Sequence, residues 1–305
     1  MIRLCKRLIR EQQGSTIVLA GFALILLLTV AGLVVDGGTM YAAKSHLQKA
    51  ANAAALSGAQ ELTSDRSKVE AVLNDILSRH KEQSSLTGAD IEMKSSVRVH
   101  LSKKVPLAFS RLLGKQSVTV QVEAAAQILP MGSAVGAAPL GIDESIELKY
   151  NTPYNLKVDS GNSNTGYFGV LALGGPGAST YEENLKYGYA NEITIGNIID
   201  TQTGNIAGKT REGVKLRIDS DPYPPGDYSH RDSPRVILIP VYRPYNQTSN
   251  QMKQIEVTGF AFFYILEPMS SNDDSIRGMF IERPDTGFYK PGAVDKGAFA
   301  IRLVE

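Results

Sequence analysis

The chain has 305 residues, of which 43% are hydrophobic and 21% charged, as is typical of a globular protein rather than a disordered one. That length leaves room for two domains and an anchor. A net charge of +1 without a concentrated basic face gives no electrostatic basis for binding nucleic acid. Cys5 is the sole cysteine, which excludes an intrachain disulfide and a cysteine-based zinc site.

The first element is an apolar run from Ser15 to Val35, 21 residues without a charge, of which 13 are Leu, Ile, Val or Phe. As a helix this run is roughly 31 Å long, enough to cross the hydrocarbon of a bilayer. Asp36 ends the run, because an acid at the bilayer centre costs about 2.5–3.5 kcal/mol. The run predicts a transmembrane helix.

Basic residues on one side of this helix predict its orientation. Residues 1–14 carry Arg3, Lys6, Arg7 and Arg10 against one acid, whereas the rest of the chain has 28 basic and 30 acidic residues, a net charge of −2. A basic flank favours the cytoplasmic side, so we expect a cytoplasmic tail at 1–14, a span at 15–35 in the cytoplasmic membrane, and everything beyond Asp36 outside. A cleaved signal peptide is the alternative, although its apolar region is normally only about 7–15 residues long.

A narrow stripe of mostly small apolar residues continues the helical pattern beyond the span. Spacings of three and four separate its members, which are Met40, Ala43, Leu47, Ala50 and Ala54. Such a stripe lets a helix or a sheet approach closely, either within the chain or in a neighbouring subunit. Gly37 and Gly38 are candidates for a flexible break in the helix, since Gly costs about 1 kcal/mol in a helix interior.

These segments strongly resemble the amino-terminal module of Tad (tight adherence) pilus-assembly proteins, particularly the TadG-like kind. The resemblance rests on Gln13–Ser15, the apolar run, Val35–Gly38, Tyr41–Ala43 and Leu47–Ala59. It departs from the family at Asn52, where Asp is usual. It implies partners among other membrane proteins of a pilus or secretion system. Prepilins of such systems are cut after a Gly and carry Glu at the fifth mature position. A cut after Gly14 puts Leu19 there, so we expect no such maturation.

Residues 36–130 read as this Tad-like helix followed by a small α+β module. Helical spacing continues from Val69 to about Lys81, and 84–90 is polar enough for a loop. A strand pattern covers 91–101, Leu107 to Leu113 is typical of a short helix that ends at Gly114, and the next strand follows at 118–122. At the level of the fold this arrangement resembles a pilin.

Residues 131–138 are small and uncharged, which predicts a linker, and 139–305 then form a β-rich extracytoplasmic domain. Val236 to Ile239 is continuously apolar and predicts a central strand buried on both faces. Two short helices are expected, at 181–187 and 210–217, while 219–232 is too rich in Pro, Gly and Asp for regular structure. The other expected strands are 146–150, 154–158, 167–173, 192–199, 255–266, 278–281 and 298–304.

No motif in the sequence predicts catalysis, a cofactor site or a metal site. The segment from Gly204 to Thr210 is one residue short of a phosphate-binding loop, and a turn that enters a helix capped by Thr210 fits it better. The histidines His46, His80, His100 and His230 are scattered, without metal-ligand spacing.

The predicted fold class is therefore α+β: a transmembrane helix, a pilin-like module and a β-rich domain. The predicted function is a single-pass, non-catalytic component or minor subunit of a Tad/Flp-like pilus assembly or secretion system. Its expected partners are the lipid bilayer and other proteins of that system. The alternative is a surface adhesin or ligand-binding protein that uses the same anchor. An extracytoplasmic enzyme is a third class, which no catalytic constellation supports.

Overall fold

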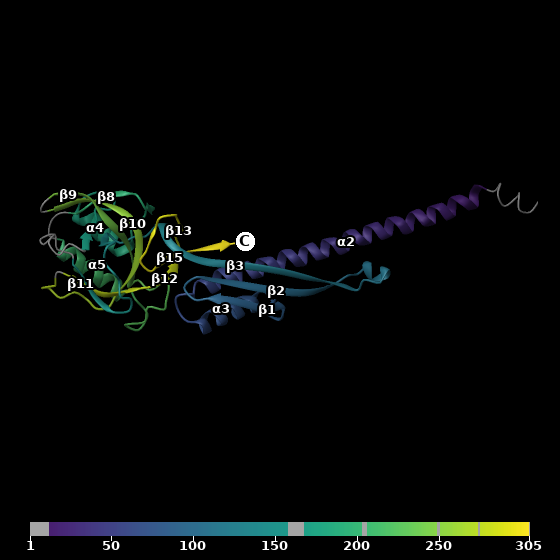
Figure 1. The fold of residues 1–305 in the computed structure, drawn as a ribbon, viewed down its shortest axis with the longest axis horizontal. Coiled ribbons are helices and arrows are strands. Elements are labelled where there is room, and N and C mark those ends of the chain that lie inside the picture. Colours follow the sequence, from purple (N-terminus) through teal and green to yellow (C-terminus); the bar gives the residue numbers. More distant parts are fainter. Residues whose placement is uncertain (1–11, 158–167, 203–205, 249–250, 274, 305) are drawn as a thin grey trace, which may run out of the picture. The chain divides into compact units, whose positions relative to one another are not determined.

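The structure, a computed structural model, describes residues 12–157, 168–202, 206–248, 251–273 and 275–304. It is α+β, as predicted: a long apolar helix precedes a β-rich part with two sheets (Figure 1). The helix, α2 (Gln12–Ala59), is continuous through Gly37 and Gly38, so the expected break is wrong. Both glycines are exposed within a long helix, where the neighbouring turns outweigh their low propensity.

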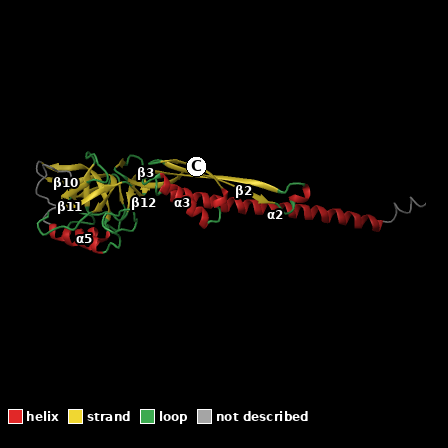
Figure 2. Cartoon of the chain, turned by 90° about the horizontal axis from the view of Figure 1, so that it is seen from below, coloured by secondary structure: helices red, strands yellow, loops and turns green. Residues whose placement is uncertain are grey.

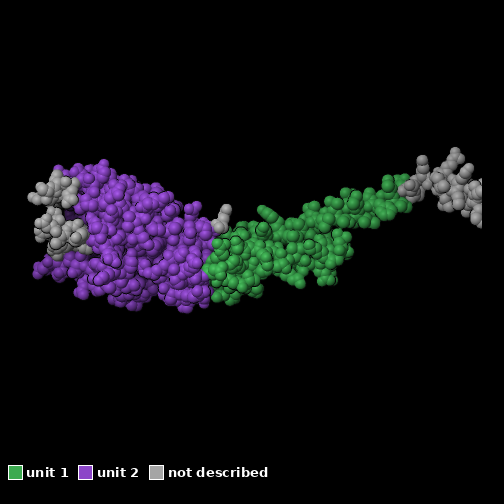
Figure 3. Space-filling view, in the orientation of Figure 1, with its two compact units in different colours: residues 1–55, 73–90, 98–124 green, residues 56–72, 91–97, 125–305 purple. Residues whose placement is uncertain are grey.

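The chain divides into two compact units, which Figure 3 colours separately. Unit 1 consists of residues 1–55, 73–90 and 98–124, and unit 2 of residues 56–72, 91–97 and 125–305. Several elements contribute to both: α3 (Arg66–Arg79), β1 (Leu86–Glu92), β2 (Ser96–Pro106) and β3 (Ser117–Ala134).

Within unit 1, α2 lies along β2 and β3, as the two ribbon views agree (Figures 1 and 2). Alternate residues of β2, among them Val99 and Leu101, are buried, which is the pattern of a strand with one covered face. Two short 3₁₀ helices complete the unit, η1 (Gln83–Ser85) before β1 and η2 (Ser110–Leu113) at the tip that connects β2 to β3. Gly114 ends η2 with φ of 88°, a left-handed conformation that favours glycine.

Across the described residues of both units, the named strands belong to two sheets. The first has the order β1-β2-β3-β15-β12, with β7 and β13 also paired to β3, and the second has the order β5-β11-β10-β9-β4-β6, with β8 and β14 paired to β10. The elements not yet given are β4 (Leu140–Asp143), β5 (Pro153–Lys157), β6 (Phe168–Val170), α4 (Ala178–Tyr187), β7 (Ile193–Thr194), β8 (Ile198–Asp200), α5 (Ala207–Asp219), β9 (Val236–Thr248), β10 (Gln251–Ile265), β11 (Ser275–Ile281), β12 (Arg283–Asp285), β13 (Phe288–Tyr289), β14 (Val294–Asp295) and β15 (Ala298–Val304).

The core of unit 2 lies on both faces of the second sheet. On one face Ile237 and Ile239 pack in a cluster that includes Leu185 of α4 and Val214 of α5. On the other face Leu238 packs with aromatic side chains of β10. The prediction of a central strand at 236–239 is therefore confirmed, because its neighbouring side chains are buried on opposite sides.

Several local predictions were wrong. The expected loop at 84–90 contains most of β1, a strand in which only Ile91 is buried and whose Thr87, Asp90 and Glu92 are exposed. The expected strand at 91–101 is interrupted by a turn at 93–95, where Lys94 has φ of 62°. Residues 146–150 are not a strand, although Ile146, Leu148 and Tyr150 pack on the core. The alternation of apolar and polar residues in this segment therefore reflects burial of the apolar side chains and not pairing with another strand.

The segment expected as a linker, 131–138, begins inside β3. Met131 and Ser133 are fully buried, and a Cβ on Gly132 would lie 2.5 Å from the Lys290 Cβ. The chain approaches itself closely at this point, which requires small residues. A run of small uncharged residues has the same composition in a tightly packed strand as in a linker, so composition does not separate the two.

Candidate functional site on the long helix and its hairpin

The first half of α2 presents large apolar side chains outward. Leu19 is 72% exposed, Phe22 70% and Val34 69%, and the other large apolar residues from Ile17 to Val35 are exposed as well. Within the described residues, the structure has one helix that is long and apolar enough to cross a membrane, beginning at Thr16. A core helix of a soluble protein would bury this surface. The helix therefore fits a membrane anchor.

The character of α2 changes at Asp36. Met40 and Ala43 are half-buried, and Leu47, Ala50 and Ala54 are fully buried in the chain's own fold. All five are members of the small-residue stripe that the sequence singles out. The basic residues Arg3, Lys6, Arg7 and Arg10 lie outside the described residues.

Asp36 itself is 3% exposed and holds the β2–β3 tip against α2. Its Oδ1 accepts the backbone N–H of Ala108 at 2.8 Å, and its Oδ2 accepts those of Phe109 at 3.1 Å and Ser110 at 2.5 Å. Hydrogen bonds to an ionised acceptor are stronger than neutral ones. The carboxylate thus satisfies three consecutive backbone donors where the strand ends.

Next to this contact, Phe109 covers Gly32 of α2. A Cβ on Gly32 would lie 2.5 Å from the Phe109 Cγ, so only glycine admits the ring at this position. Phe109 and the side chains of η2 line an apolar groove of about 310 Å³ together with α2. The lining residues are Ile25, Leu28, Thr29, Leu33, Phe109, Leu112 and Leu113.

Glu82 forms a second polar cluster in unit 1. Its side chain is 2% exposed, accepts the hydroxyl of Ser85 at 2.6 Å and pairs with Lys103, while the His46 Nε2 lies 3.4 Å away. Burial raises the pKa of Glu82, but the hydrogen bonds from Lys103 and Ser85 and the charges of Lys103 and His46 outweigh it and lower the pKa below its ordinary value. The cluster fixes β2 and the segment before β1 beside α2.

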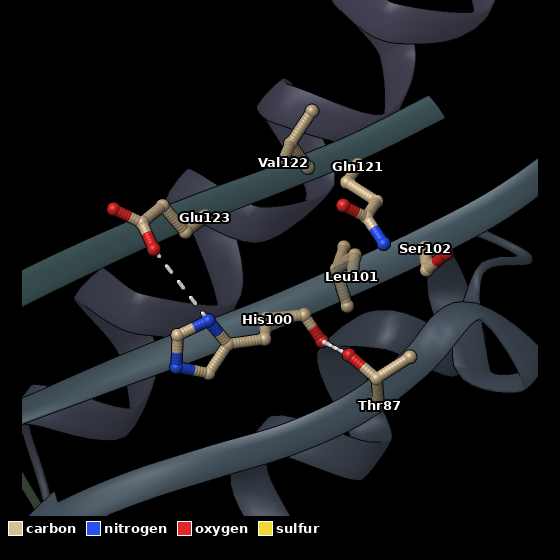
Figure 4. Close-up of a pocket in the computed structure, with 7 residues that line it drawn as sticks. All are labelled: Thr87, His100, Leu101, Ser102, Gln121, Val122 and Glu123. Atoms are coloured by element: carbon tan, nitrogen blue, oxygen red, sulfur yellow. Dashed lines mark hydrogen bonds and ion pairs between the residues drawn. The ribbon is translucent and has the colours of Figure 1, made fainter. Parts of the chain in front are cut away.

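A shallow groove of about 410 Å³ crosses the strands of unit 1 near His100 (Figure 4). The His100 Nε2 lies 3.0 Å from the Asp90 Oδ2, and its Nδ1 lies 3.6 Å from the Glu123 Oε2. The other carboxylate oxygen of Glu123 pairs with Arg98. The Thr87 hydroxyl donates to the His100 carbonyl at 3.0 Å. These are cross-strand pairs on an exposed sheet surface.

Residues 220–232 have no regular structure, as predicted, whereas Asp219 is the last residue of α5. The loop is held by its own side chains. The Tyr223 ring stacks on His230 at 3.6 Å between centroids, and its hydroxyl donates to Asp232 at 2.7 Å. That hydrogen bond raises the pKa of Tyr223 and lowers the pKa of Asp232. The histidine therefore belongs to a packing contact in the loop.

The segment that resembles a phosphate loop leads into α5, which begins at Ala207. Thr210 lies one turn inside the helix and donates to the Ile206 carbonyl, so the expected cap at Thr210 is wrong. The Lys209 ammonium lies 2.9 Å from Glu182 and 3.3 Å from Glu212. Across the described residues, no group of three or more His, Cys, Asp or Glu side chains is placed to hold a metal ion.

Comparison with known proteins gives a match that covers most of the long helix α2. Residues 14–61 match the model of the family described as putative Flp pilus-assembly TadE/G-like. This segment is TadE/G-like. The match confirms the resemblance seen in the sequence, and it covers the apolar span, Asp36 and the buried stripe. No curated protein and no solved structure matches the chain. The TadE/G-like segment and its apolar helix together fit a membrane-anchored pilus component.

Sequence reasoning found the anchor and the stripe but not the partner of Asp36. The signal was present in part, since the short helix expected at 107–113 ends in two leucines before Gly114, and the structure has the 3₁₀ helix η2 at Ser110–Leu113. Only the fold shows that these leucines lie next to the apolar span of α2.

Proposed function

We propose that the chain is a single-pass membrane protein and a non-catalytic component or minor subunit of a Tad/Flp-like pilus assembly or secretion system. The TadE/G-like match at 14–61 carries this proposal. The outward-facing apolar side chains of α2 support the anchor, because exposure of this kind is stable only in lipid or against another protein.

The proposed orientation places residues 1–14 in the cytoplasm and the chain beyond Asp36 outside. Its support is the basic flank of Arg3, Lys6, Arg7 and Arg10, which favours retention on the cytoplasmic side. Asp36 ends the apolar run on the other side, and its carboxylate is already hydrogen-bonded within the protein.

The non-catalytic assignment is supported by what the polar side chains contact. Lys209 is paired with two glutamates, His230 is stacked on a tyrosine, and His100 lies between two carboxylates on an exposed sheet surface. Each is engaged in a contact that holds strands, helices or a loop together. The exposed helix and the outer surfaces then act by binding neighbouring components.

The stripe on α2 bears on how neighbours bind. Because Leu47, Ala50 and Ala54 are buried within the chain, we propose that this stripe seats the chain's own module. Neighbouring subunits would then contact the opposite side of the helix, where Tyr41 is 77% exposed. They would also contact the lipid-facing side chains that precede Asp36 in the helix.

Cys5 allows a direct test of orientation, because it is the sole cysteine. A membrane-impermeant maleimide should label Cys5 only after spheroplasts are permeabilised. In a Cys5→Ser background, Phe288→Cys places a thiol at a position that is 70% exposed, and it should be labelled in intact spheroplasts. Labelling of Cys5 in intact spheroplasts would contradict the orientation.

The pilus role needs a separate experiment. Deleting the gene should reduce pilus assembly and surface adhesion, and expression of the intact chain should restore both. Unchanged assembly and adhesion in the deletion strain would remove the proposed role and leave an anchored surface protein. Binding of the intact protein to a surface carbohydrate, with no pilus defect on deletion, would support an adhesin instead.

A further inference from the structure

The tip between β2 and β3 exposes more apolar surface than a turn in water normally does. Leu112 is 85% exposed, Leu113 67% and Phe109 43%. A short turn that faces water is normally polar, whereas these three large side chains stand together. They lie beside the apolar span of α2, with which they line one groove of about 310 Å³.

The position of this groove along α2 determines how deep in the bilayer it lies. Asp36, which binds the amides of the tip, follows the last residue of the span, whereas Ile25 in the groove lies about 11 residues further back, or about 16 Å along the helix. A span of roughly 31 Å puts Ile25 near the bilayer centre. The groove therefore falls within the outer half of the hydrocarbon layer.

We propose that the tip, residues 107–115, inserts into the outer leaflet beside the anchor, with acyl chains of the bilayer covering Phe109, Leu112 and Leu113. The apolar surface of the tip is continuous with that of the anchor, so one lipid environment covers both. The chain would then insert into the membrane at two places, the helix α2 and the tip of the hairpin.

The charges around the tip suit the boundary between lipid and water. Residues 101–122 contain four basic side chains and no acidic one, and of these Lys104, Arg111 and Lys115 are exposed. Long basic side chains bury their stems in an apolar layer and extend their charged ends to phosphate headgroups. The tip therefore complements an anionic lipid surface.

The backbone of the tip is also suited to lipid, where an unpaired N–H costs several kcal/mol by general estimates. Internal hydrogen bonds satisfy most N–H groups of the tip. The Asp36 carboxylate accepts hydrogen bonds from the N–H groups of Ala108, Phe109 and Ser110. Backbone carbonyls accept hydrogen bonds from the N–H groups of Leu107, Leu112, Gly114 and Lys115.

The inference rests on the membrane anchor proposed above, but not on the pilus role. Tryptophan fluorescence tests it in the full chain, because the natural sequence has no Trp. Leu112→Trp places one indole on the tip, at a side chain too exposed to disturb packing. Ile25→Trp, at a position 63% exposed on α2, reports on the anchor, and Phe288→Trp, 70% exposed in unit 2, is the matched control in water.

Each variant is reconstituted in nanodiscs whose acyl chains are brominated. We expect bromine to quench Leu112→Trp and Ile25→Trp, with a blue-shifted emission for both, and to leave Phe288→Trp unquenched. Quenching of Leu112→Trp by aqueous iodide instead, with Ile25→Trp still quenched by bromine, would overturn the insertion and leave the anchor intact. If bromine quenches neither variant, the proposed anchor fails too.

A second copy of the chain is the competing occupant of the groove. It would give a blue-shifted Leu112→Trp emission that brominated lipid does not quench. In that case Leu112→Cys in a Cys5→Ser background should form a disulfide-linked dimer in the membrane. A crosslink without bromine quenching would overturn the lipid assignment.

Discussion

The Asp36 carboxylate accepts the backbone N–H of Ser110 at 2.5 Å, across 74 residues of sequence. In the sequence alone, Asp36 is the polar residue that ends an apolar run. In the fold, the same acid is the acceptor for three consecutive amides at the tip of a hairpin. One side chain therefore marks the end of the anchor and ties the following module to it.

Asp36→Asn should destabilise this contact. The amide keeps one acceptor oxygen but turns an NH₂ group toward backbone donors, and leaving buried donors unsatisfied costs about 1–3 kcal/mol. We expect the free energy of unfolding in detergent to fall by about that amount, with faster hydrogen exchange at residues 108–110.

Asp90→Asn is the control for that change, because Asp90 is an exposed carboxylate of the same unit that pairs with His100. An exposed ion pair contributes about 0–1 kcal/mol, so this variant should be nearly neutral. Equal effects of the two substitutions, without faster exchange at the tip, would contradict the role of Asp36.

Gly32→Ala tests the contact with Phe109, and Gly21→Ala is its matched control on the same helix. Nothing lies within 4 Å of a Cβ on Gly21, so alanine there should stabilise the helix by up to about 1 kcal/mol. At Gly32 the new methyl meets the Phe109 ring at 2.5 Å, and overpacking costs about 1–3 kcal/mol. Thermal unfolding in detergent should therefore separate the two variants. Equal stabilisation would show that the ring does not sit on Gly32.

The parts of the fold that follow from local periodicity could be predicted from the sequence. The apolar run, the helix at Arg66–Arg79 and the buried strand at 236–239 each carry their pattern in consecutive residues. The short helix at the tip could be predicted at its end, which Gly114 marks, but it begins at Ser110 and not at Leu107.

Contacts between distant segments could not be predicted in the same way. Nothing near Asp36 in the sequence indicates that amides 74 residues away need an acceptor. Strand β1 buries only Ile91, so its polar residues resemble those of a loop. Gly132 to Ala134 are small residues that serve close packing inside a strand, although the same composition is typical of a linker.

Acid should weaken unit 1 through Glu82. Its pKa lies below the ordinary value of 4.5 in the folded protein, so the stability that this carboxylate adds is complete above pH 4.5 and is lost as the pH falls through the folded pKa. Glu82→Gln removes the titration. The difference in unfolding free energy between the natural chain and the variant should be constant above about pH 5 and shrink below pH 4.5.

Urea unfolding across that pH range measures the difference, with Glu267→Gln as the control. Glu267 is 52% exposed in its pair with Arg277, so its removal should change the pH profile little. A pH-independent difference for Glu82→Gln would show that the carboxylate is not stabilised by Lys103 and Ser85 in the folded state.

Arg235 and Asp221 form a buried ion pair in unit 2. The Arg235 Nε lies 2.8 Å from the Asp221 Oδ2, and the two side chains are 7% and 0% exposed. Removing one partner of such a pair leaves an uncompensated buried charge and costs about 3–5 kcal/mol. Asp221→Leu should therefore reduce the free energy of unfolding in urea by about that amount, because Arg235 then lacks its counter-ion.

The double variant Asp221→Leu/Arg235→Met decides whether charge or packing is responsible. Replacing both partners by apolar side chains removes the stranded charge, and such replacements are often neutral or stabilising. We expect the double variant to recover most of the loss seen in Asp221→Leu. If the double variant is as unstable as the single one, the loss comes from the loop that Asp221 holds through the Ser233 hydroxyl, and the charge pair is not its cause.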